Sequence, residues 1–98
     1  MKIDMSLSNA ALYDGCEIEE VGGRLNLKTP PAQAANIIGR NVAAMVEGVP
    51  ADERVLVTLT GPMAVWAYLI VFHAVLHKFS RVEYDDGRGN VVIVAAHG

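Results

Sequence analysis

Cysteine, charge and long apolar runs are all scarce in this chain of 98 residues. The single cysteine, Cys16, excludes an intrachain disulfide and a paired-cysteine zinc site, which is typical of a protein from a reducing compartment. There are 8 Lys and Arg against 11 Asp and Glu, so the formal net charge is −3. This balance excludes general coating of nucleic acid, but it leaves room for a local basic pocket.

Membrane and export signals are also missing. The most apolar stretch, residues 62–76, has about 15 residues and is interrupted by His73, whereas a bilayer-spanning helix needs about 20. It therefore indicates a buried helix. The first residues, Met1 to Asp4, lack the apolar core of a secretory signal peptide. We expect a cytoplasmic protein that has neither a membrane nor DNA as its partner.

The first half of the chain predicts a strand, a hairpin and a helix. Apolar and polar residues alternate over residues 2–8 and again over 16–28, where Gly22-Gly23 supports a tight turn. Residues 30–47 then show helical spacing after Thr29, which is expected to cap that helix. These elements look like scaffold.

The second half predicts a strand, a second helix and a closing hairpin. Residues 55–60 are apolar almost throughout, which favours a central strand buried on both faces. Thr60 is expected to cap the apolar helix that follows, which lies inside the domain or in a subunit interface. Residues 81–84 and 91–96 then form a hairpin. The whole chain, residues 1–98, is expected to be one α/β domain with a mixed sheet and two main helices.

The junction Thr60-Gly61-Pro62 is a candidate anion site. Ligands of open α/β sheets bind beyond the carboxyl ends of the strands. The glycine permits close approach, and the next helix offers free N–H groups and the positive end of its dipole. The alternative is an ordinary strand-to-helix turn.

Two histidines, His73 and His77, lie one helical turn apart and so on one face of the second helix. Such a pair can bind a metal, although the glutamate of a zinc-protease motif is absent. His77 is the better candidate, because it lies near Arg81 at the start of the next strand. The alternative is one solvent-facing histidine and one packed in the core.

A turn with Asp85, Asp86 and Arg88 follows, and His97 ends the last strand. A carboxylate there can bind a divalent cation or orient a histidine, and an arginine can clamp a phosphate. Solvated turn charges and a mobile terminal histidine are the alternatives. The sequence does not decide between the two aspartates.

Taken in order, these residues resemble a known family. The series runs from Gly61-Pro62 through Trp66 and His77 to Tyr84-Asp85-Asp86-Gly87-Arg88, then Val91-Val92-Ile93-Val94 and His97. It is similar to the small stand-alone CRISPR-associated ring nucleases of type III systems, also described as manganese-dependent RNA exonucleases. Their fold is a reduced relative of the CRISPR-associated Rossmann domain.

The resemblance implies a homodimer that binds cyclic tetra-adenylate, in some members between two dimers, and degrades it to switch off antiviral signalling. It places catalytic roles on His77, on Asp85 or Asp86, and on Arg88. Ligand contacts are expected from Thr60, Gly61, Pro62, Arg81 and His97. Manganese would be held by His77 and Asp86, with His73 as a candidate third ligand. Alternatively, the reaction would need no metal.

Two other functions fit the same residues. The family often has a second helix histidine three residues before the first, and here that position is Ala74. This difference favours a module that binds or sequesters a cyclic oligonucleotide without cutting it. The apolar second helix alternatively indicates a structural dimerisation protein that binds no nucleotide.

Overall fold

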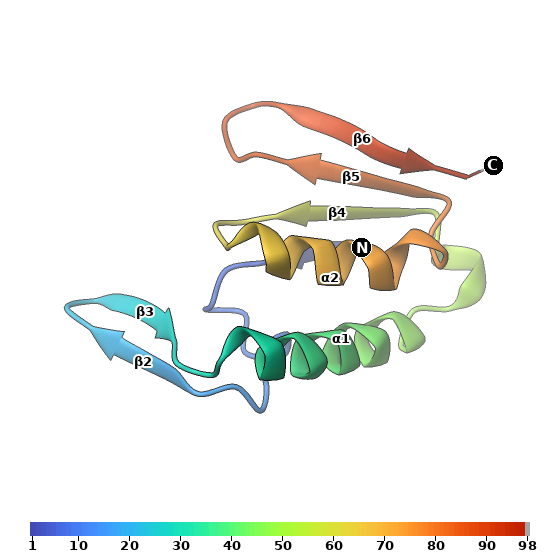
Figure 1. Cartoon of the computed structure of the whole chain (residues 1–98). Helices are drawn as coiled ribbons and strands as arrows, with labels where there is room; N and C mark the ends of the chain where they lie inside the picture. Colours follow the sequence, from blue (N-terminus) through green and yellow to red (C-terminus); the bar gives the residue numbers. More distant parts are fainter. Residues whose placement is uncertain (98) are drawn as a thin grey trace.

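A computed structural model gives the structure of residues 1–97, and Gly98, the last residue of the expected domain, lies outside the described part. It is a small α/β fold with one four-stranded sheet, two helices and a separate two-stranded hairpin (Figure 1). The elements are β1 (Lys2–Asp4), β2 (Ile18–Val21), β3 (Arg24–Leu27), α1 (Pro31–Glu47), η1 (Ala51–Glu53), β4 (Leu56–Thr60), α2 (Val65–Leu76), β5 (Arg81–Asp85) and β6 (Val91–Ala96). None of the helices in residues 1–97 is both long and apolar enough to cross a membrane.

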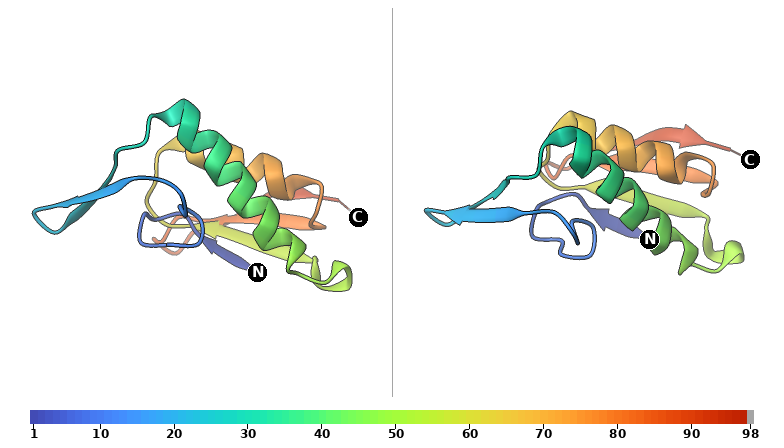
Figure 2. Two further views of the ribbon diagram at one scale, coloured as in Figure 1. Left: turned by 90° about the horizontal axis from the view of Figure 1, so that it is seen from below. Right: turned by 60° about the horizontal axis from the view of Figure 1, so that its bottom comes forward.

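The sheet has the order β1-β4-β5-β6, in which the first three strands are parallel and β6 is antiparallel to β5. The chain crosses from β1 to β4 through α1 and from β4 to β5 through α2. Successive right-handed crossovers in one direction place both helices on the same face. Figure 2 shows both helices on that face and the opposite face open.

The core lies between this one face and the two helices. Buried side chains come from alternate strand positions and from one stripe of each helix. They include Ile3, Val57, Leu59 and Val82 of the sheet, Ala34, Ile38 and Val42 of α1, and Ala67, Val71 and Val75 of α2. Gly39 of α1 lies opposite Ile70 of α2, and a Cβ at this position would make only an ordinary 3.8 Å contact with Ile70.

The prediction that the central strand is buried on both faces is wrong. Only Val57 and Leu59 of β4 are buried, and Thr58 lies on the open face. There its hydroxyl donates a 2.8 Å hydrogen bond to Glu83 of β5. The reason is that both crossovers cover the same face, which leaves the other without helices.

Both predicted helix caps are also wrong. Thr29 instead accepts a 2.7 Å hydrogen bond from the backbone N–H of Glu17, and Pro30 is the N-cap of α1. Thr60 donates a 2.9 Å hydrogen bond to the Asp85 carbonyl, and α2 begins only at Val65. The hydroxyls therefore tie loops and strands together. The hairpin prediction is confirmed, because Gly22 and Gly23 form its turn with φ of 58° and 79°.

We expect Gly61→Ala to destabilise the protein by about 3 kcal/mol or more, because strain and a steric clash add together. Gly61 has φ of 101°, and a Cβ there would lie 2.5 Å from Asp4 Oδ1 and 3.1 Å from two backbone nitrogens. Gly22→Ala is the matched control, because Gly22 also has positive φ but nothing lies within 4 Å of its Cβ position. Urea unfolding measures both, and equal losses would contradict the clash.

The raised pKa values of two tyrosines lead us to expect a loss of stability at alkaline pH. Burial raises the pKa of Tyr68 to about 12, with a smaller contribution from Tyr84, and burial also raises the pKa of Tyr13. Above pH 10 the unfolded chain releases these protons while the folded chain keeps them, so the free energy of unfolding falls between pH 10 and 12. Urea unfolding at a series of pH values measures this slope. Tyr68→Phe should make it shallower, and an unchanged slope would contradict the assignment.

Candidate functional site

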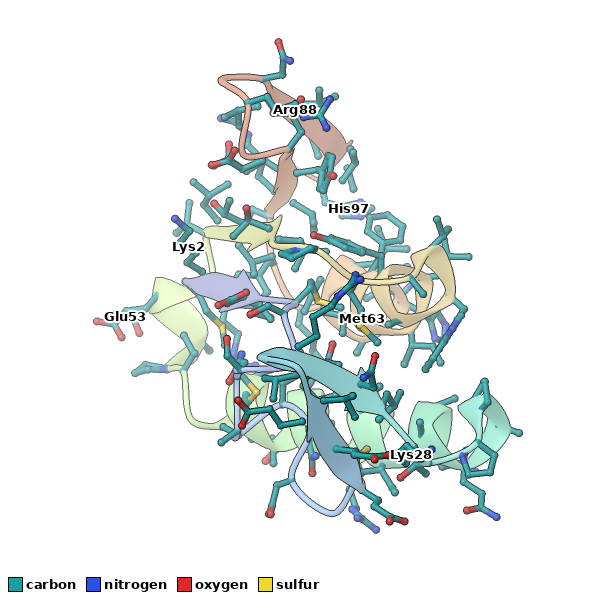
Figure 3. The ribbon with its side chains drawn as sticks, turned by 90° about the vertical axis from the view of Figure 1, so that its left-hand side faces the viewer. Lys2, Lys28, Glu53, Met63, Arg88 and His97 are labelled. Carbon is teal, nitrogen blue, oxygen red and sulfur yellow. The ribbon has the colours of Figure 1, made fainter. Side chains whose placement is uncertain are left out.

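The loops that follow β1 and β4 border a hollow of about 340 Å³ at the carboxyl ends of the parallel strands. Figure 3 looks onto this end, with Met63 near the β2–β3 hairpin and Arg88 in the β5–β6 turn farther away. The lining residues are Ser6, Leu7, Ser8, Arg24, Leu25, Pro62 and Met63. This is where open α/β sheets bind their ligands.

Local hydrogen bonds hold the loop after β1 in place. The backbone N–H of Ser6 donates a 2.9 Å bond to Asp4 Oδ1, and the hydroxyls of Ser6 and Ser8 are 2.8 Å apart. Gly61 packs against this loop with no room for a side chain, and its carbonyl accepts a hydrogen bond from Tyr68 of α2. The two loops are thus fixed relative to each other before any ligand binds.

The hollow combines two hydroxyls, one guanidinium and several apolar side chains. Guanidinium and hydroxyl groups donate hydrogen bonds to phosphate, and apolar surfaces suit a base or ribose. The sequence prediction named Pro62, which lines the hollow, and Gly61, which shapes it. It missed Ser6, Ser8 and Arg24. No spacing along the chain could have shown Arg24, because only the placement of the β2–β3 hairpin brings it here.

The β5–β6 turn lies at the same end of the sheet and distinguishes the two aspartates. Asp86 accepts hydrogen bonds from the backbone N–H groups of Arg88 and Asn90 and from the Asn90 side chain. The Asn90 amide, followed by the Arg88 N–H, lowers the pKa of Asp86. Asp85 accepts one such bond, from Gly87. Asp86 therefore holds the turn, which leaves Asp85 as the better candidate for chemistry.

The histidines lie at the other end of the sheet. His77 caps the C-terminus of α2, and its ring centroid is 5.9 Å from that of His97. The backbone N–H of His97 donates to the Ser80 carbonyl at 2.6 Å, which fixes the end of β6. Beside it is a second hollow of about 490 Å³, lined by Val55, Leu56, Ser80, Arg81, Ala96 and His97. His77, Arg81 and His97 thus gather at one end, as neighbours of this hollow.

The structure separates the predicted catalytic residues into two groups within one subunit. The five residues of β5 run between Arg81 and Asp85, which separates the two ends by about 13 Å. His77 and Asp86, the predicted manganese ligands, do not meet. His73 is exposed on α2, and within residues 1–97 no three His, Cys, Asp or Glu side chains are placed to hold a metal ion. Within one subunit, His77 and Asp86 are therefore not joint ligands of a single ion.

Comparisons with known proteins provide no relative. No family model matches the chain, and searches of curated proteins and of solved structures found no match. Any assignment of function therefore depends on the residues and geometry described above.

Proposed function

We propose that this protein binds cyclic oligoadenylate, with cyclic tetra-adenylate as its preferred ring, and cuts it to end type III CRISPR signalling in the cytoplasm. The observation that carries the proposal is the hollow at the carboxyl ends of β1 and β4, with Ser6, Ser8 and Arg24 in its wall. Its 340 Å³ suits one nucleotide of a ring, with the phosphate on the polar side and the base against Met63 and Leu25.

The paired histidines supply the groups that phosphodiester cleavage needs. A ribose 2′-hydroxyl attacks the adjacent phosphorus, forming a 2′,3′-cyclic phosphate while the bond from phosphorus to the 5′ oxygen breaks. One imidazole of the His77 and His97 pair accepts the 2′ proton, and the other gives a proton to the 5′ oxygen. An arginine, Arg81 or Arg88, stabilises the charge that develops on the phosphate oxygens. No step of this reaction is assigned to a metal.

The order and direction of the strands support a relationship to nucleotide-binding folds. Strands β1, β4 and β5 are parallel and joined by two helical crossovers, the arrangement of half a nucleotide-binding sheet. We therefore propose a reduced Rossmann-like fold that acts as a homodimer. We also propose that the ring joins dimers into a larger assembly, which light scattering with the ring present would reveal.

One observation favours a second function. Because Arg24 and the hollow lie far from His77 within one subunit, a single subunit can bind an anion without cutting it. This arrangement fits a module that sequesters a cyclic oligonucleotide. Tight binding without any product would establish this alternative.

The test is to incubate purified protein with cyclic tri-, tetra- and hexa-adenylate, with manganese or with EDTA, and to separate the products by chromatography. We expect loss of the tetra-adenylate ring and formation of linear product in both conditions. Intact rings in every sample would reject the enzyme, and binding measured by calorimetry would then decide for or against the sequestering module.

Arg24→Ala is expected to weaken ring binding about 10- to 100-fold, because it removes a charge-assisted hydrogen bond worth about 1.5–3 kcal/mol. Lys28→Ala is the matched control, since Lys28 lies on the same hairpin but pairs with Glu19 at 3.3 Å, away from the hollow. Calorimetry with cyclic tetra-adenylate measures both variants. Equal affinities for the two would remove Arg24 from the site.

A further inference from the structure

The two edges of the four-stranded sheet differ in length and charge. The edge strand β1 has three residues and carries Lys2 and Asp4. The edge strand β6 has six residues, Val91 to Ala96, and none of them is charged. Natural proteins protect exposed edges with short strands, charges, prolines or β-bulges. The β1 edge has the first two of these protections. The β6 edge has only a register shift that leaves Val94 as an extra residue opposite Val82 and Glu83.

The side chains of β6 are apolar on both faces of the sheet. Val91 and Ile93 pair with Asp85 and Glu83 on the open face, and both are 54% exposed. On the helix face, Val94 borders an apolar hollow of about 270 Å³. The other lining residues are Leu59, Tyr68, Leu69, Phe72 and Tyr84. Val91 to Val94 are all exposed, because α2 lies over the neighbouring strands and only borders β6 at this hollow.

The backbone of β6 is also free to pair. The Asp86 N–H donates to the Asn90 carbonyl, so Asn90 directs its backbone towards β5. Because backbone direction alternates along an antiparallel strand, Val91 and Ile93 direct their N–H and C=O groups away from the sheet. A further strand laid along β6 would satisfy them.

We propose that two copies of this chain pair antiparallel through the free edges of β6 and form one continuous sheet across a two-fold axis. A strand placed antiparallel to its own copy is self-complementary, as an interface with two-fold symmetry requires. The apolar side chains on each face then meet their counterparts. The edge offers backbone hydrogen bonds and apolar side chains but no charge, which favours an equally apolar strand such as the β6 of a second copy.

The exposed apolar area is of the size that a dimer needs. Seven large apolar side chains between 37% and 72% exposed lie on α2, β5 and β6, namely Val65, Leu69, Tyr84, Val91, Val92, Ile93 and Val94. Together they offer on the order of 500 Å², at the upper end of what a monomer leaves in water. A standard interface buries about 800 Å² on each partner, and the strand backbone and flanking residues supply the difference.

This pairing also reunites the two groups of site residues, a consequence that rests on the proposed function. Antiparallel strands place the start of one β6 beside the end of the other. The turn with Asp85 and Arg88 precedes β6, and His97 follows it. In the dimer, the turn of one copy therefore lies next to His77 and His97 of the other. Each active site would take its arginine and its histidines from different copies.

The test is the mass of the ligand-free chain in solution, by light scattering and sedimentation. We expect twice the chain mass of 10.5 kDa for the natural sequence. Ile93→Lys places two like charges near the axis and is expected to weaken the dimer at least about 100-fold. Val21→Lys is the matched control, because Val21 is 55% exposed on the β2–β3 hairpin, and it should remain dimeric.

A second variant separates loss of pairing from loss of folding. Ile93→Pro removes only an outward N–H, which an edge strand tolerates, and it should give a folded monomer by circular dichroism. A monomeric natural chain, or a dimeric Ile93→Lys, would overturn the proposal. Because no ring is present, failure of this experiment is independent of failure of the ring-cleavage assay.

Discussion

His77→Ala is expected to slow cleavage of cyclic tetra-adenylate by about 10²- to 10⁴-fold, the usual contribution of a positioned general acid or base. The ring of His77 lies 5.9 Å from that of His97, so the two imidazoles can act on opposite sides of one phosphate. His77 is exposed at the end of α2, and its side chain contributes no hydrogen bond to the structure of residues 1–97. Its removal should leave the stability and the ring affinity nearly unchanged.

The matched control for this prediction is His73→Ala. His73 is also exposed and lies one turn earlier on α2, whereas the ring that lies beside His97 is that of His77. Single-turnover rates of ring cleavage should be nearly the same in the natural protein and in His73→Ala, and about 10²- to 10⁴-fold lower in His77→Ala. A loss of the same size in both variants would contradict the assignment of His77.

The spacing of apolar residues predicted most of the helices and strands, but it did not predict which face of the sheet the helices cover. Alternation over residues 16–28 and helical spacing over 30–47 gave the hairpin and α1, since those patterns depend on local geometry. The run from Val55 to Thr60 predicted a strand correctly but assigned its burial wrongly. An apolar side chain such as Leu56 can lie on an open face, and only the directions of the crossovers decide which face the helices cover.

The residues of the candidate site could also be predicted only in part from the sequence. Gly61 could be found from the sequence, because a glycine after a strand is a local signal. Arg24 could not, because a hairpin far along the chain brings it to the hollow. Proximity in the sequence also made His77 and Asp86 look like neighbours. A full strand, β5, runs between them and carries them to opposite ends of the sheet.

Mixing two inactive variants is expected to restore activity if each site takes residues from both copies. If Arg88 is the arginine of the site, His77→Ala and Arg88→Ala each inactivate both sites of their own dimer. After random exchange of subunits, about half of the dimers are mixed, and one of their two sites has neither substitution. Cleavage should therefore return from the residual level to about a quarter of the rate of the natural protein, measured at equal total protein. A site built within one subunit predicts no recovery.

The control mixture combines His77→Ala with His97→Ala. These two rings are neighbours in one copy, 5.9 Å apart, so every site of a mixed dimer carries one of the two substitutions. This mixture should stay inactive even though its subunits exchange equally well. Recovery in the first mixture alone would place Arg88 and His77 of one site on different copies. Recovery in both mixtures would mean that the two histidines of one site come from different copies. Recovery in neither mixture would mean that the arginine and the histidines of one site come from the same copy.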